Sequence, residues 1–152
     1  MKLSSLLTAD RVVLDVKEKD KKTMLLRLIG TLSGLGGIAD TTVLEKEVME
    51  REDLGNTGIG RGVGFPHSKS TQVRDILILL ARPLKPVEYG AIDHTPVNII
   101  LLLVAPADGD NNEYLHTMAR ISRLLGKNDV RQKILAARTA EEVVAIVRVN
   151  EG

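Results

Sequence analysis

The chain has 152 residues, a length at which one domain can bury a core without disulfides or a metal. Its formal net charge is +1 and the two signs are interleaved, which argues against a nucleic-acid-binding surface. Because there is no cysteine, disulfides, thiol catalysis and cysteine-ligated metals are excluded.

The first half of the chain predicts one strand and two helices. Residues 11–16 are rich in valine and predict a short strand, and apolar residues at helical spacing predict a helix over 21–33. Asp40 or Thr41 can cap a second helix that ends near residue 52. Residues 34–39 loosely match a dinucleotide-binding fingerprint, but they follow a helix and not a strand, so we interpret them as a helix cap and turn.

The second half predicts two buried strands and three helices. Residues 76–81 and 97–105 are continuous apolar runs, typical of central strands covered on both faces. The proline-containing connection between them, residues 82–96, allows a short edge strand near Tyr89. Helices are expected over the ranges 113–125, 128–137 and 139–149. The chain therefore predicts a single α/β domain over residues 1–152, with a mixed sheet of roughly five strands and helices on both faces.

No targeting or membrane segment is expected. The longest apolar run, residues 99–105, is too short to span a bilayer, and the first ten residues do not resemble a signal peptide. We therefore expect a cytoplasmic protein without stable membrane insertion.

A glycine-rich segment precedes His67. Glycines at positions 58, 60, 62 and 64 leave one face of an extended segment without side chains, so a ligand or another backbone can approach closely. Backbone N–H groups there could hold an anion, and Pro66 restricts the backbone just before His67. A phosphate-binding loop of the Walker type is excluded, because Phe65 follows the last glycine where such a loop needs lysine. From these residues alone, an anion site and a plain glycine-rich hairpin with an incidental histidine are equally open.

The other two histidines give weaker signals. His94 lies in an expected turn, and His116 borders the helical stripe formed by Leu115, Met118, Ile121, Leu124 and Leu125. No two histidines have the spacing of a metal site, so we expect no metal and no cofactor.

The segment Thr57-Gly58-Ile59-Gly60-Arg61-Gly62-Val63-Gly64-Phe65-Pro66-His67 resembles the active-site motif of the fructose/mannitol-type Enzyme IIA family. These proteins are phosphocarriers of the bacterial phosphoenolpyruvate-dependent phosphotransferase system. Glu50-Arg51-Glu52 upstream and His116 downstream are also similar to the family, whose fold is a mixed five-stranded sheet with helices on both faces. Two positions depart from its usual pattern: Gly64 stands in place of alanine, and Ser68 in place of glycine or alanine.

The resemblance implies roles for individual residues. His67 would be the phosphorylated histidine, His116 the second histidine that supports the phosphorylated state, and Arg51 the cation that balances the phosphate charge. The further candidates for phosphate binding are Thr57, Gly60, Gly62 and Ser68.

The implied function is a phosphoryl carrier that is loaded by an HPr-like phosphohistidine carrier protein. A regulatory protein of the nitrogen-type branch, acting on a target protein, is favoured, because no Enzyme IIB or membrane domain is fused and residues 1–7 are similar to that branch. A sugar-specific Enzyme IIA that passes phosphate to an Enzyme IIB is the first alternative, and a non-phosphorylated regulatory binding module is the second. Aromatic residues make up only 2% of the chain, which offers no evident dimer patch and favours a monomer.

Overall fold

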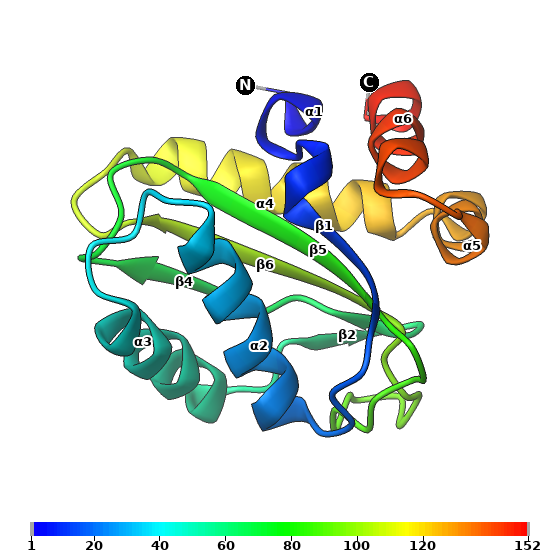
Figure 1. Ribbon diagram of the computed structural model, residues 1–152, viewed down its shortest axis with the longest axis horizontal. Coiled ribbons are helices and arrows are strands. Elements are labelled where there is room, and N and C mark those ends of the chain that lie inside the picture. Colours follow the sequence, from blue (N-terminus) through cyan, green and yellow to red (C-terminus); the bar gives the residue numbers. More distant parts are fainter. Residues whose placement is uncertain (1, 152) are drawn as a thin grey trace.

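The computed structural model describes residues 2–151 and arranges them around one mixed sheet (Figure 1). Its strands are β1 (Val12–Val16), β2 (Gly58–Gly60), β3 (Val63–Gly64), β4 (His67–Ser70), β5 (Leu77–Pro83) and β6 (Ile99–Pro106). The order across the sheet is β1-β5-β6-β3-β2, and β4 also pairs with β6. Val63 pairs with Ile99 and His67 with Leu103, so β3 and β4 follow one another along the same side of β6. The six strands thus occupy five positions, which confirms the expected mixed sheet and refines its strand number.

The two long apolar runs form the centre of this sheet, as predicted. β5 and β6 pair antiparallel, β1 runs parallel to β5, and β3 and β4 run parallel to β6. Every residue of β5 except Arg82 is buried, and every residue of β6 except Pro106. Strands covered on both faces cannot alternate between apolar and polar residues, which explains their continuous apolar sequence.

The helices lie close to the ranges expected from the sequence. They are α1 (Leu3–Leu6), the 3-10 turn η1 (Ala9–Arg11), α2 (Lys21–Gly34), α3 (Thr41–Leu54), α4 (Asn111–Leu125), α5 (Asn128–Ala136) and α6 (Ala140–Asn150). The Asp40 carboxylate accepts the Val43 N–H and so caps α3, as the sequence indicated. Gly36 and Gly37 have positive φ and form the turn after α2, which confirms the interpretation of residues 34–39.

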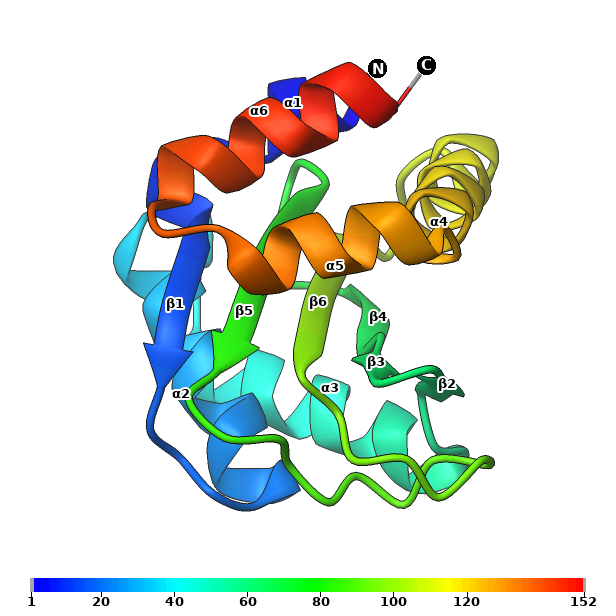
Figure 2. The same cartoon turned by 90° about the vertical axis from the view of Figure 1, so that its right-hand side faces the viewer.

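The helices form two layers, one on each face of the sheet (Figure 2). α1, α4, α5 and α6 cover one face, where side chains such as Ile78, Leu101 and Leu103 form an aliphatic cluster. α2 and α3 cover the other face over Leu79, Leu102 and their neighbours. Adjacent residues of β5 and β6 therefore serve opposite layers, as the alternation of side chains along a strand requires. Within residues 2–151 every helix is too short or too polar to cross a membrane.

The prediction of an edge strand near Tyr89 was wrong. Residues 84–98 contain no strand, and Val87 makes only an isolated bridge with Val97. Tyr89 is 2% exposed, and its side chain fills the second apolar cluster. The connection is thus held by burial of Tyr89, Val87 and Val97 together with isolated bridges, and not by a regular strand.

Candidate active site

His67 begins β4 at the edge of the sheet, with its imidazole oriented by the backbone just before it. Its Nδ1 lies 2.7 Å from the carbonyl oxygen of Phe65. Since a carbonyl oxygen can only accept, Nδ1 carries the proton in the neutral ring. The lone pair is therefore on Nε2, and the imidazole presents this nitrogen as its nucleophilic atom.

Arg51, in the last turn of α3, supplies the cation beside that nitrogen. Its Nη2 lies 3.3 Å from Nε2 of His67, and its Nη1 donates to the carbonyl of Gly55 at 3.2 Å. The carbonyl of Gly55 thus fixes one arm of the guanidinium while the other arm faces His67. A planar guanidinium held in this way matches the oxygens of a phosphoryl group.

The surroundings of His67 lower its pKa below the ordinary value of 6.5. Burial is the main cause, and the positive charge of Arg51 adds to it. The hydrogen bond to the Phe65 carbonyl and the negative charge of Glu52 act in the opposite direction. The net effect keeps the imidazole neutral near pH 7, which is the form that acts as a nucleophile.

A buried polar network lies behind this pair. Glu52 is 6% exposed, and its Oε1 accepts from both the N–H and the hydroxyl of Thr57, at 3.1 and 3.0 Å. Lys21 of α2 places its Nζ 2.6 Å from the same oxygen and 4.4 Å from the centre of the Tyr89 ring. The hydroxyls of Tyr89 and Thr57 are 3.0 Å apart. The network ties the start of the glycine-rich segment to α3.

Thr57 is consequently not available to a ligand. It is 4% exposed, and both its N–H and its hydroxyl are engaged inside the protein. We therefore do not include it in the phosphate site.

Gly60 and Gly62 serve the hairpin between β2 and β3. Gly60, Arg61 and Gly62 have φ values of 85°, 58° and 83°, a conformation that glycine adopts without strain. A Cβ atom at Gly62 would lie 2.7 Å from Oδ1 of Asn98, so the turn also needs the missing side chain. Strand β3 pairs with Ile99 of β6, whereas His67 pairs with Leu103, four residues further along β6. These two pairing positions are about 13 Å apart along the strand. The two glycines shape the hairpin away from His67.

Gly64 and Ser68 also face the interior. A Cβ atom at Gly64 would come within 3.1 Å of the Tyr89 ring, so glycine at this position makes room for the tyrosine. Ser68 is 6% exposed and its hydroxyl donates to the carbonyl of Lys69. As the residue after His67 in a strand, it points to the opposite face. The structure thus does not bring Ser68 to the acceptor nitrogen.

The structure does not bring His116 to His67 and Arg51 either. It lies on the exposed surface of α4, and among residues 2–151 no hydrogen bond or ring contact joins it to His67 or Arg51. His94 sits in a turn at a φ of 58°. Within the same residues, no three His, Cys, Asp or Glu side chains are grouped so that they could hold a metal ion.

Sequence reasoning missed Lys69, which is partly buried on the same face of β4 as His67. Its Nζ donates to Oδ1 of Asn111 at 2.6 Å and lies 5.6 Å from the ring centre of Tyr114. The two-residue period of a strand, counted from His67, was the signal that could have found it.

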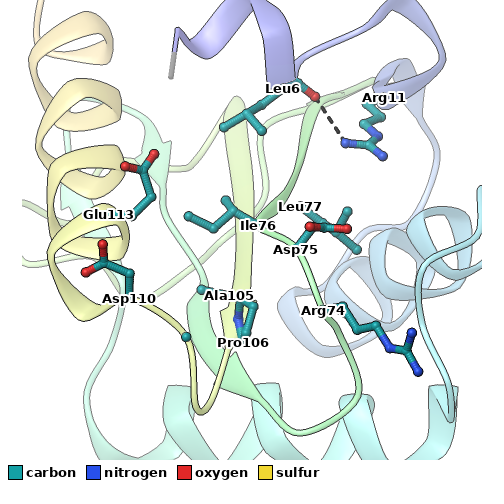
Figure 3. Close-up of a pocket in the computed structure, with 11 residues that line it drawn as sticks. Leu6, Arg11, Arg74, Asp75, Ile76, Leu77, Ala105, Pro106, Asp110 and Glu113 are labelled. Atoms are coloured by element: carbon teal, nitrogen blue, oxygen red, sulfur yellow. Dashed lines mark hydrogen bonds between the residues drawn. The ribbon is translucent and has the colours of Figure 1, made fainter.

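A cavity of about 430 Å³ lies elsewhere, at the junction of β6 and α4 (Figure 3). Asp110 and Glu113 come from the α4 side, and Arg11, which donates to the carbonyl of Leu6 at 3.2 Å, stands across from them. Its lining does not include His67 or Arg51. The candidate acceptor, at the sheet edge, therefore lies outside this cavity.

Comparison with known proteins identifies the class to which this fold and site belong. Residues 5–149 match the family described as phosphoenolpyruvate-dependent sugar phosphotransferase system, EIIA 2. The chain belongs to this family, which confirms the resemblance seen in the sequence.

Nitrogen regulatory proteins and sugar-specific components are both among the relatives. The nitrogen regulatory protein of Bradyrhizobium diazoefficiens is 32% identical over 147 residues, which cover 97% of this chain and 95% of that protein. The fructose-specific EIIABC component of Bacillus subtilis is 27% identical over 99% of this chain, but the match spans only 24% of that longer protein. The crystal structure of the nitrogen regulatory protein IIA-Ntr from Neisseria meningitidis has a TM-score of 0.89 at 26% identity, covering 95% of this chain and 98% of that one.

Proposed function

We propose that this protein is a phosphoryl carrier in which Nε2 of His67 accepts the phosphoryl group from an HPr-like phosphohistidine carrier protein. One observation carries the proposal: Nδ1 of His67 is bound to the Phe65 carbonyl while Nε2 faces the guanidinium of Arg51. An acceptor histidine needs this arrangement, with one nitrogen fixed, the other nucleophilic, and a cation where the phosphoryl charge arrives.

The transfer forms one bond and breaks one. The lone pair of Nε2 attacks phosphorus in line, and the P–N bond to the donor imidazole breaks with its electron pair returning to the donor nitrogen. The proton on Nδ1 stays in its hydrogen bond to Phe65. Arg51, which touches Nε2 before transfer, then faces the phosphoryl oxygens and offsets their charge. Phosphoryl transfer of this kind passes through a loose transition state, so catalysis depends on positioning and electrostatics. The oriented, neutral imidazole of His67 and the guanidinium of Arg51 supply both.

The donor must dock against an open surface around His67. Leu54, three residues after Arg51 at the end of α3, is 85% exposed and Leu115 on α4 is 49% exposed. Exposed apolar side chains of this kind, on the helices that carry Arg51 and Tyr114, suit a transient protein contact. Val63 and Phe65 contribute nothing to this surface, because they are 1% and 3% exposed.

A regulatory role of the nitrogen type is the form of the function that we favour. The nitrogen regulatory protein of Bradyrhizobium diazoefficiens matches this chain over nearly the full length of both. The specific alternative is a sugar Enzyme IIA, supported by the fructose-specific relative. Transfer from phosphorylated His67 to a fructose- or mannitol-type Enzyme IIB would decide for the sugar role. We further propose that the carrier is a monomer, which its few aromatic side chains favour, and that it acts in the cytoplasm.

The test is phosphorylation in vitro. The full chain is mixed with phosphoenolpyruvate, Enzyme I and an HPr-like protein, and intact masses are recorded beside those of His67→Ala and the control His94→Ala. We expect wild type and His94→Ala to gain one phosphoryl group and His67→Ala to gain none. A full gain by His67→Ala would refute the acceptor, and no gain by wild type with several donors would favour a non-phosphorylated binding module.

A further inference from the structure

The edge strand that carries His67 contacts the first turn of α4 through one side chain. Lys69 connects the two elements, since its Nζ binds Asn111 at 2.6 Å and lies 5.6 Å from the ring centre of Tyr114. Lys69 and His67 are two residues apart on β4, so their side chains share one face and their Cα atoms are about 6.6 Å apart. Tyr114 therefore stands beside the face of β4 that presents the acceptor.

The hydroxyl of Tyr114 is free to bind a ligand. The ring is partly buried against the core, yet among residues 2–151 its hydroxyl has no hydrogen-bond partner. The only other tyrosine, Tyr89, is different, because its hydroxyl is engaged by Thr57. Burial raises the pKa of Tyr114 while the positive charge of Arg51 partly opposes that rise. The phenol thus stays protonated and can donate, and it lies within electrostatic reach of the guanidinium beside His67.

His116 cannot occupy the same position. It follows Tyr114 by two residues, which is about 200° around the helix axis at about 100° per residue. α4 buries Thr117, Ile121 and Leu124 against the sheet, and this face leaves His116 exposed. A helix that presents Tyr114 to β4 therefore turns His116 away from it.

We propose that Tyr114, and not His116, is the residue of α4 that lines the phosphoryl site, and that its hydroxyl donates a hydrogen bond to a phosphoryl oxygen on His67. This inference rests on the proposed function of His67 as acceptor. The phosphoryl group is then held between Arg51 of α3 on one side and Tyr114 of α4 on the other. Lys69, whose ammonium lies over the Tyr114 ring, adds a second positive charge next to the site.

The experiment measures the transfer equilibrium. Phosphorylated HPr-like protein, freed of Enzyme I and phosphoenolpyruvate, is mixed with wild type, Tyr114→Phe or His116→Ala, and the phosphorylated fractions are read from intact masses. Because the new hydrogen bond exists only in the phosphorylated form, we expect Tyr114→Phe to lower the equilibrium constant about fivefold and His116→Ala to leave it unchanged. Tyr114→Phe keeps the ring that packs beside Lys69, and a general loss of stability would affect the free and phosphorylated forms alike.

A second readout uses wild type alone. In NMR spectra of protein labelled with ¹³C at Cζ of tyrosine, phosphorylation should shift the Tyr114 signal, which the Tyr114→Phe spectrum assigns. An unchanged equilibrium constant in Tyr114→Phe together with an unshifted signal would overturn the inference while leaving His67 as acceptor. A decrease in His116→Ala instead would assign the role to that histidine. Failure of wild type to accept phosphate would overturn the proposed function and this inference with it.

Discussion

The centre and the edge of the sheet are built in different ways. In β5 and β6, burial between two helix layers holds the strands, and nearly every side chain is apolar. Along the edge, β2, β3 and β4 are only two to four residues long, and glycines and Pro66 separate them. Burial of residues such as Val63 and Phe65 is supplemented along this edge by specific side-chain hydrogen bonds. The edge can therefore expose a histidine while keeping that histidine in a fixed orientation.

Helix α3 provides several of those hydrogen bonds. Glu47 accepts from the hydroxyl of Ser70 at 2.6 Å and from the N–H of Thr71 at 3.1 Å, at the far end of β4. Glu52 accepts from Thr57 at the other end of the edge, and Arg51 reaches His67 between them. Three side chains of one helix thus position the edge, and the candidate site depends on the register between α3 and β4.

The largest effect should come from the centre. Leu102 is 0% exposed in the middle of β6, so Leu102→Ala should lower the free energy of unfolding by about 3 to 4 kcal/mol. The fraction that remains folded should accept phosphate at the normal rate, because no site residue is touched. Urea denaturation measures the stability, with the exposed Leu54→Ala as a control that should change it by less than about 0.5 kcal/mol. A loss of transfer in folded Leu102→Ala would show that the two regions are not separate.

Arg51→Lys tests the edge and should have the opposite effect: phosphoryl transfer should slow while stability is nearly unchanged. Lysine keeps the charge but cannot bind Gly55 and face His67 with two arms of one planar group. We expect the rate of phosphoryl acceptance to fall by about tenfold to 100-fold, measured by rapid quench and intact mass. The unfolding free energy should change by less than about 1 kcal/mol. Arg123→Lys, at an exposed position of α4, is the matched control, and an equal rate in both variants would remove Arg51 from the mechanism.

The same contrast explains what the sequence could predict of the fold. Apolar runs and helical periodicity located β5, β6 and the helices, because burial leaves a regular pattern in the sequence. The edge strands and the loop around Tyr89 follow from contacts between distant residues, such as Asn98 with Gly62 and Tyr89 with Thr57. Such contacts leave no periodic pattern, and so the glycine-rich segment could be described only as extended.

The proximity of two candidate site residues was predictable from a motif. The motif placed His67 and Arg51, and the structure brings them within 3.3 Å. On α4 the sequence suggested that Leu115 belongs to the buried stripe, but Leu115 is 49% exposed and Thr117 is 1% exposed. The other predicted residues of the stripe, Met118, Ile121, Leu124 and Leu125, do pack against the core, so periodicity was wrong only at the border of the buried face. Tyr114 lies on the packed side of this border and His116 on the exposed side.

The smallest predicted effect comes from removing the negative charge of Glu52, which the buried network places behind His67. Glu52 raises the pKa of His67 against burial and Arg51, which lower it. Glu52→Gln removes this charge, so the pKa of His67 should fall further below 6.5 and the acceptance rate should persist to lower pH. Histidine signals in an NMR titration and the pH profile of the rate measure this. Glu50→Gln, on the exposed side of α3 beside Lys46, is the control.

The sign of the accompanying stability effect can be derived. With a folded-state pKa below the unfolded value, the unfolded chain binds more protons between the two values. The contribution of His67 to stability is therefore fully present above pH 6.5 and is lost as the pH falls through that window. Glu52→Gln should extend the window downwards, and the unpaired Lys21 should lower stability at every pH. If the pKa of His67 instead stays constant or rises in Glu52→Gln, the network positions the edge strands but does not tune the pKa of the acceptor. The edge would then differ from the centre only in how its residues are positioned.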